Sequence, residues 1–229
     1  MYARVLATLC LLSSSIYIAM AGSPERGVPV SLRLRTGAVP AAAREEMEKE
    51  LSGLMSTAGV TVRWEDPNSY RDVSGYTVVV DLDGDCSVPF HTETAPLREG
   101  TPIGSTAMAE SHLLPFIDVN CDVLGELVAQ LAADQPEALR QFVLGRALGR
   151  VLAHELYHIV AQSQEHSESG VTKASLSAAD LMNSRFEFNE TALDRMHASR
   201  AAYSGAAESA AASLDSGGSE FSEAAADGK

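Results

Sequence analysis

Basic residues are scarce in this chain. Lys and Arg number 17 against 31 Asp and Glu, so the 229 residues carry a formal net charge of −14. A protein with this balance repels the phosphates of nucleic acids and anionic lipid surfaces. We therefore expect no nucleic-acid partner. A basic peptide would be attracted, although the charge alone does not identify one.

Long apolar runs are also scarce, and the one that exists lies at the N-terminus. Arg4 precedes a mostly apolar stretch from Val5 to Met20, and Ala19-Met20-Ala21 offers the small residues of a cleavage site. The stretch is short for a membrane span, which favours a cleaved signal peptide over residues 1–21 rather than an uncleaved anchor. Without it, 16 basic residues remain against 31 acidic ones, a net charge of −15. No later segment is apolar enough to cross a bilayer, so we expect a secreted or periplasmic protein without stable membrane insertion after signal cleavage.

Cysteine is rare as well, with three in the chain. Cys10 lies in the expected signal peptide, which leaves Cys86 and Cys121. Two cysteines in an exported protein favour one disulfide, with two unpaired buried thiols as the alternative. The segment that follows the signal peptide contains no cysteine, which excludes a cysteine-switch latch over a metal.

The chain divides into a body over residues 22–203 and a tail over residues 204–229. The body is long enough for one domain with a sizeable core. The tail consists mainly of Ala, Ser, Gly and acidic residues, a composition that predicts disorder. In the body, alternating or valine-rich apolar residues predict five strands, the third of them central. These strands are expected over residues 30–35, 60–64, 76–82, 105–110 and 114–119.

Three segments of the body have helical patterns. The first begins at Pro40 and ends at Gly59. The second runs from about residue 134 to about residue 162, and Asp134 and Glu137 at its start resemble a capping box. The third begins after Asn189, a good N-cap residue, and runs to about residue 203. Together with the strands, these helices predict an α+β domain in which a mixed sheet packs on the long second helix.

Two glycines four residues apart, Gly145 and Gly149, lie inside the long helix. Each costs about 1 kcal/mol relative to alanine in a helix interior. The favoured reason for keeping both is a close approach of this helix to the sheet, with simple tolerance as the alternative.

The same helix carries the sequence HELYH, from His154 to His158, in a chain with only six histidines. Histidines four residues apart on a helix share one face and can bind one zinc ion. Glu155 lies beside that face, where it can take a proton from a metal-bound water. The alternative interpretation is a helix with two surface histidines and a solvated glutamate.

A catalytic zinc has three protein ligands and one open position. His166 is the nearest candidate for the third ligand, provided that the helix ends near Gln162 and the chain turns back. Glutamates are the competing candidates: Glu165, Glu168, Glu187 and Glu190.

The string HELYHIVAQSQEHSESGVT, residues 154–172, resembles the metzincin-type zinc peptidases of the zincin superfamily. Their usual motif is HExxHxxGxxH, whereas this chain has Ala161 and Gln164 at the glycine and third-histidine positions. The string is closer to a group of exported bacterial zinc peptidases with the pattern HELGHLLLGxxxHSxxGIM. The resemblance covers roughly residues 30 to 200, including the opening of the last helix at residues 188–191, but only residues 143–172 are distinctive.

Three residues depart from the pattern of that group. Gln162 replaces a glycine that would ease a left-handed turn at the helix end. Tyr157 replaces a glycine between the ligands, and its side chain is expected to lie off the metal face. Thr172 replaces a methionine; Met182 is a possible substitute for it, but core packing is the favoured role of Met182. None of the departures removes a ligand or the base.

The resemblance implies a zincin-like domain that hydrolyses peptide bonds, with one zinc ion held by His154, His158 and His166 and with Glu155 as general base. It also implies that a peptide or protein substrate lies along the strand expected over residues 105–110. Tyr157, Tyr203 and Thr172 are candidates for stabilising the oxyanion. The first alternative function is a catalytically inactive zinc-binding homologue that binds peptides or proteins, and the second is an exported structural protein without a metal. The oligomeric state is not indicated by the sequence.

Overall fold

The computed structural model describes residues 28–36, 38–65, 76–89 and 102–199. The expected signal peptide and the expected tail lie outside these residues. The elements in chain order are β1 (Val28–Thr36), α1 (Ala41–Thr57), β2 (Val60–Glu65), β3 (Tyr76–Asp83), β4 (Gly104–Ala109), β5 (His112–Asn120), α2 (Cys121–Ala132), α3 (Glu137–Ala161) and α4 (Ala178–Met182). Residues 190–199 are also helical, and we call this segment helix 190–199. None of the helices in the described ranges is long and apolar enough to span a membrane.

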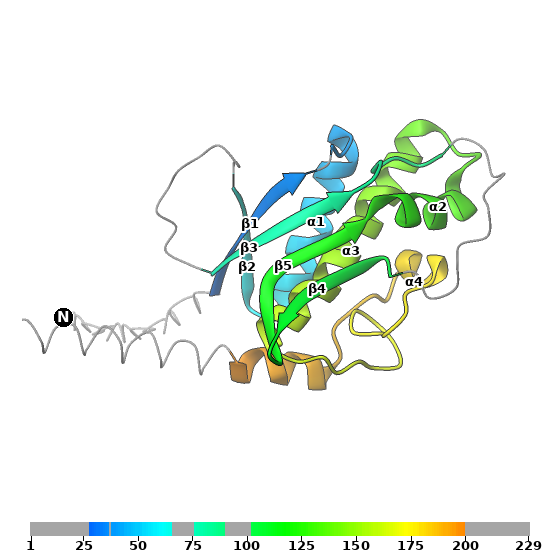
Figure 1. Ribbon diagram of the computed structural model, residues 1–229. Coiled ribbons are helices and arrows are strands. Elements are labelled where there is room, and N and C mark those ends of the chain that lie inside the picture. The colour runs from blue at the N-terminus through cyan, green and yellow to red at the C-terminus, as the bar shows by residue number, and fades with distance from the viewer. Residues whose placement is uncertain (1–27, 37, 66–75, 90–101, 200–229) are drawn as a thin grey trace, which may run out of the picture.

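The strands form one five-stranded mixed sheet in the order β2-β1-β3-β5-β4 (Figure 1). The four strands β2, β1, β3 and β5 are parallel, and β4 runs antiparallel to β5 at one edge. All five predicted strands are therefore confirmed, with β3 in the centre and the segment near residue 105 at an edge. The predicted fold class, a mixed sheet packed on one long helix, is confirmed too.

One face of the sheet carries the core. On β5, Ile117 and Val119 are buried whereas Phe116 and Asp118 are exposed, as expected for a strand with two different faces. Figure 1 shows α1 and α3 together behind the strands, and buried residues of both helices form one core cluster with those of the strands. The helix with the HELYH sequence is thus packed against both the sheet and α1.

The two glycines of α3 lie against α1, which corrects the prediction that they approach the sheet. A Cβ atom on Gly145 would lie 2.2 Å from the carbonyl oxygen of Ala43. A Cβ atom on Gly149 would lie 2.8 Å from the carbonyl oxygen of Met47. Both distances are too short for a real contact, so the glycines allow the backbones of the two helices to come together. The prediction of close approach was right, but its partner was wrong.

Residues 121–132, to which the sequence patterns assigned no element, form α2. Its signals are an N-cap, since the Asn120 side chain accepts from the Val123 N–H at 3.0 Å, and buried apolar residues four apart such as Leu124 and Val128. Because α2 and its final turn occupy the chain as far as residue 135, α3 begins at Glu137 instead of near residue 134. Pro136 is its N-cap, so the predicted capping box from Asp134 is wrong.

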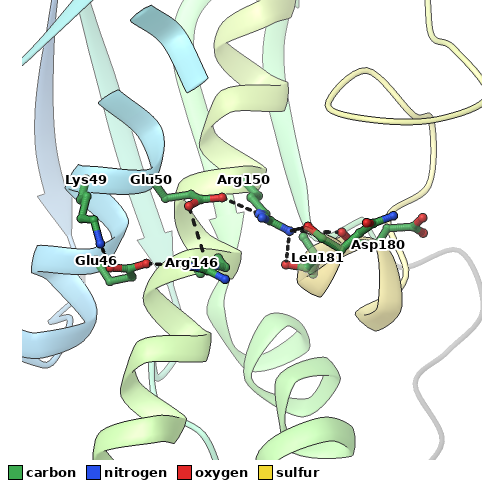
Figure 2. Close-up of polar contacts among 8 residues, drawn as sticks. Glu46, Lys49, Glu50, Arg146, Arg150, Asp180 and Leu181 are labelled. Carbon is green, nitrogen blue, oxygen red and sulfur yellow. Dashed lines mark hydrogen bonds and ion pairs between the residues drawn. The ribbon is translucent and has the colours of Figure 1, made fainter. Parts of the chain in front are cut away.

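An ionic network holds α1, α3 and the C-terminal end of α4 together (Figure 2). Arg150 of α3 is 4% exposed, and its Nε donates to Glu50 of α1 at 2.6 Å. Its Nη1 donates to the carbonyl oxygens of Leu181 and Asn183, each at 2.8 Å. The guanidinium also lies 4.6 Å from the centre of the Phe186 ring. One buried cation therefore joins three segments of the chain.

The predicted disulfide is present between Cys86 and Cys121, whose Cα atoms are 4.7 Å apart. It links the loop after β3 to the first residue of α2. Both cysteines are fully buried in the core. Asp122 strengthens the same junction, since its Oδ1 accepts from the Asp85 N–H at 2.8 Å.

Candidate metal centre

His154 and His158 face each other on the last turns of α3. Their Nε2 atoms are 3.0 Å apart, and the side chains are 8% and 7% exposed. The Nδ1 of His154 lies 2.7 Å from the carbonyl oxygen of Val171, and the Nδ1 of His158 lies 2.6 Å from that of Ser163. A carbonyl oxygen can only accept, so each Nδ1 carries a proton and each Nε2 presents a lone pair. Carbonyl acceptors of this kind commonly orient metal-bound histidines.

This pair fits a zinc ion. Two lone pairs 3.0 Å apart in a buried site repel each other, and a cation between them removes that repulsion. Two nitrogens on a tetrahedral zinc at 2.0–2.1 Å would be separated by about 3.3 Å, so a small adjustment suffices. Burial lowers the pKa of His154 to about 4, against the opposing effect of its bond to Val171. Burial also lowers the pKa of His158, so both rings stay neutral and able to bind metal near pH 7.

His166 completes a group of three. Its ring is stacked on His154 with 5.3 Å between centroids and is edge-on to His158 at 4.9 Å. One ligand atom from each histidine lies within 4.8 Å of the others, and among the described residues this is the one group found that could hold a metal. The three expected ligands are thus brought together, whereas the competing glutamates are absent from the group. Three nitrogens leave one position of a tetrahedral ion open, which is the arrangement of a catalytic site.

The turn that brings His166 back begins at Gln162, which ends α3. Gln162 adopts the left-handed conformation, with φ 47° and ψ 44°, where glycine is usual. Its side-chain amide donates to the Leu113 carbonyl oxygen at 3.2 Å and accepts from the Leu113 N–H at 3.3 Å. The expected left-handed turn is therefore present, and the glutamine side chain uses it to join the end of α3 to β5.

Glu155 points toward the edge strand β4. The hydroxyl of Thr106 donates to Glu155 Oε2 at 2.8 Å. A Cβ atom on Gly104 would lie 2.8 Å from Glu155 Oε1, so the glycine leaves space for the carboxylate. Burial raises the pKa of Glu155 to about 7, and the hydrogen bond from Thr106 opposes this shift. A carboxyl group with such a pKa can both take and give a proton near neutral pH.

Two of the three residues predicted to stabilise the oxyanion, Tyr157 and Thr172, lie in the described part of the chain, and both are buried. Tyr157 is fully buried, off the metal face as expected, and its hydroxyl accepts from Arg195 at 3.4 Å. Thr172 is 2% exposed, and its hydroxyl pairs with that of Ser167 at 2.7 Å. Tyr203 lies outside the described residues. Met182 packs against the core, the role favoured for it.

Sequence reasoning missed the residues that orient the site. Thr106 and Gly104 are about 50 positions from Glu155, and no local pattern connects them. Val171 and Ser163 act through backbone carbonyl groups, which every residue has. The HELYH pattern could therefore predict His154 and His158 as metal ligands, but not the groups that orient their side chains.

No known family model matches the chain, and no curated protein sequence matches it. Solved structures that show similarity include an archaemetzincin and a zinc-dependent peptidase. Archaemetzincin from Methanopyrus kandleri is 15% identical with a TM-score of 0.44, over 79% of this chain and 98% of that one. A zinc-dependent peptidase from Methanocorpusculum labreanum is 12% identical with a TM-score of 0.47, over 73% of this chain and 99% of that one.

Proposed function

We propose that this protein is an exported zinc-dependent metallopeptidase, with His154, His158 and His166 as ligands of one zinc ion and Glu155 as general base. The observation that carries the proposal is the pair of facing Nε2 lone pairs, each fixed by a protonated Nδ1. This arrangement is typical of metal-binding histidines, whose other ring N–H almost always donates to a carbonyl, carboxylate or water. The proximity of His166 and of a buried carboxyl group supports the same conclusion.

When bound, zinc would polarise the scissile carbonyl and lower the pKa of water at its open position. Glu155 would take the proton of the attacking water and pass it to the leaving amine. Thr106 holds Oε2 in place, which leaves Oε1 free to handle that proton. The pKa of about 7 suits both steps, because neither form of the carboxyl group is strongly disfavoured near neutral pH.

The edge strand β4 is the proposed place for an extended peptide. It pairs with β5 along one side and is last in the sheet order, and no strand of the described residues pairs with its other side, where we propose strand addition. Thr106 of β4 contacts Glu155, so a peptide on this edge would lie next to the base. Peptides and proteins are therefore the proposed substrates, and the excess of acidic residues would favour basic ones.

Two features support export. The N-terminal residues have the pattern of a signal peptide. The disulfide between Cys86 and Cys121 suits an oxidising compartment, since the cytosol keeps most thiols reduced. Secretion or periplasmic location thus belongs to the proposal, to be tested by locating the protein in fractionated cells.

The function is tested by the metal content and peptidase activity of the purified protein beside a Glu155→Gln variant. We expect about one zinc per chain in both proteins and hydrolysis of unstructured peptides by the parent alone. If both bind zinc and neither hydrolyses any peptide of a broad library, the protein is the inactive peptide-binding homologue. If the parent binds no zinc after supply of the ion, the metallopeptidase is refuted.

A further inference from the structure

His166 differs from the other two proposed ligands in what holds it. His154 and His158 are side chains of a long, packed helix, and each is hydrogen bonded to a carbonyl oxygen. His166 is exposed and lies in the loop that follows α3. A ligand on a loop must be ordered when the metal binds, and the entropy of that ordering weakens binding unless the loop is held beforehand. Among the described residues, Gln164 of this loop donates to the Met108 sulfur of β4 at 3.1 Å, and a charged side chain from another element contacts Glu165.

That side chain is Arg195 of helix 190–199. Its Nη2 forms an ion pair with Glu165, the residue before His166. Its Nη1 lies 3.4 Å from the hydroxyl of Tyr157, the residue before His158. One planar guanidinium therefore contacts the immediate neighbours of two proposed ligands, which are otherwise separated by the turn at Gln162.

The Tyr157 hydroxyl is held in place by the packing of its side chain. Its side chain is fully buried and belongs to α3, and its ring lies 6.3 Å from that of Phe188. Helix 190–199 is anchored to the core by Ala192 and Met196, which are 1% and 0% exposed, and the Asn189 side chain caps its start by accepting from the Ala192 N–H at 2.8 Å. The third part of this arrangement is the loop of residues 163–166, which Arg195 contacts through the Glu165 carboxylate.

We infer that Arg195 is a positioning residue for the metal centre: by joining Glu165 to Tyr157 it holds the loop of residues 163–166 where His166 can reach the ion shared by His154 and His158. The inference deepens the proposed function and rests on it. It also gives a role to Tyr157, which replaces the glycine of the related motif.

The ion pair is not expected to stabilise the fold. The side chain of Glu165 is 68% exposed and that of Arg195 is 34% exposed, and exposed pairs contribute little to the free energy of unfolding. The effect of Arg195 should therefore be seen in metal affinity. Replacing a residue that positions a metal ligand without binding the metal itself typically lowers metal affinity by about 10- to 100-fold. For a contact that acts through one ligand of three, we expect the lower end, about 10-fold.

The test measures zinc affinity of the full-length protein by competition with a chromophoric chelator. Arg195→Met removes the guanidinium and keeps most of the stem, and Glu165→Gln removes the charge of its partner. Each should weaken zinc binding about 10-fold, and the double variant should be no weaker than either single one. Arg185→Met removes an exposed arginine outside the contact and should leave the affinity unchanged. The thermal midpoint of the zinc-free proteins should be the same for all.

A His166→Ala background distinguishes an effect of Arg195 that acts through His166 from an effect on zinc affinity that does not. If Arg195 acts through His166, then Arg195→Met should have no effect in the His166→Ala background. An equal loss in both backgrounds, or no loss in the parent, would overturn the inference while leaving the peptidase proposal intact. A parent that binds no zinc would overturn both. Arg195→Lys should recover part of the affinity, because the ammonium can pair with Glu165 but cannot reach Tyr157 at the same time.

Discussion

Replacing Arg150 by methionine should destabilise the zinc-free protein by about 3–5 kcal/mol, because it removes the cation from a buried ion pair. Two terms determine the magnitude. Glu50, which is 17% exposed in its side chain, loses its partner at 2.6 Å. The carbonyl oxygens of Leu181 and Asn183 lose their donor, at about 1–3 kcal/mol each if they stay dry. Water that enters after the substitution will donate hydrogen bonds to some of these oxygens, so the two destabilising contributions do not simply add.

A matched control lies one turn away on the same helix. Arg146 also pairs with α1, through Glu46 at 3.3 Å and Glu50 at 3.7 Å, but its side chain is 30% exposed. Arg146→Met should therefore cost about 1 kcal/mol or less. The measurement is urea unfolding at equilibrium with a chelator present, for both variants and for Arg150→Met combined with Glu50→Gln. The double variant should be more stable than additivity predicts, because it no longer buries a carboxylate that has lost its partner at 2.6 Å and keeps only Arg146 at 3.7 Å.

Equal losses for the two arginine variants would refute this reasoning, since burial is what distinguishes them. So would a loss below about 1 kcal/mol for Arg150→Met, a value typical of exposed ion pairs.

Three further predictions concern the site, the disulfide and pH. Gly104→Ala should lower the proposed peptidase activity by about 100-fold and leave zinc bound, since the new Cβ displaces the Glu155 carboxylate. Kinetics and metal analysis check this, with Gly53→Ala as the control, because a Cβ on Gly53 meets no atom within 4 Å. Replacing Cys86 and Cys121 by serine should cost about 4 kcal/mol in urea unfolding, from the 35-residue separation, and a cost near zero would contradict the linkage. Because the pKa of Glu155 rises from 4.5 to about 7 on folding, its ionisation destabilises the zinc-free protein as pH rises through that window. Glu155→Gln should therefore stabilise the protein by about 3 kcal/mol more at pH 8 than at pH 4.5, and a pH-independent difference would show that the carboxyl group has its ordinary pKa.

The sequence predicted those parts of the structure that follow from local patterns. Alternating or valine-rich apolar residues and the HELYH spacing are patterns over a few neighbouring positions, so β1 to β5 and the facing histidines could be anticipated. The α2 helix was missed although Asn120 and the apolar residues after it carried a local signal.

Contacts between distant segments could not be predicted in the same way. Gly145 lies against Ala43 of α1, and Thr106 bonds to Glu155 across 49 positions. Nothing near either residue in the sequence specifies its partner, because the partner depends on how the elements pack. The carbonyl groups that orient the histidines are even less visible, since the backbone is the same at every residue.

Two departures from the related motif, Gln162 and Tyr157, acquire a physical reason from these distant contacts. A left-handed residue with a side chain costs about 1–2 kcal/mol relative to glycine. The two hydrogen bonds between the Gln162 side chain and the Leu113 backbone, one donated and one accepted by Gln162, are large enough to offset this cost. Glycine would make the turn without strain but could not join α3 to β5. Likewise, Tyr157 fills a buried position and offers a hydroxyl to Arg195, which a glycine could not do. Both substitutions therefore replace backbone freedom with a side-chain contact at the point where the chain turns toward His166. A Gln162→Gly variant should keep the turn while loosening the β4–β5 edge beside Glu155.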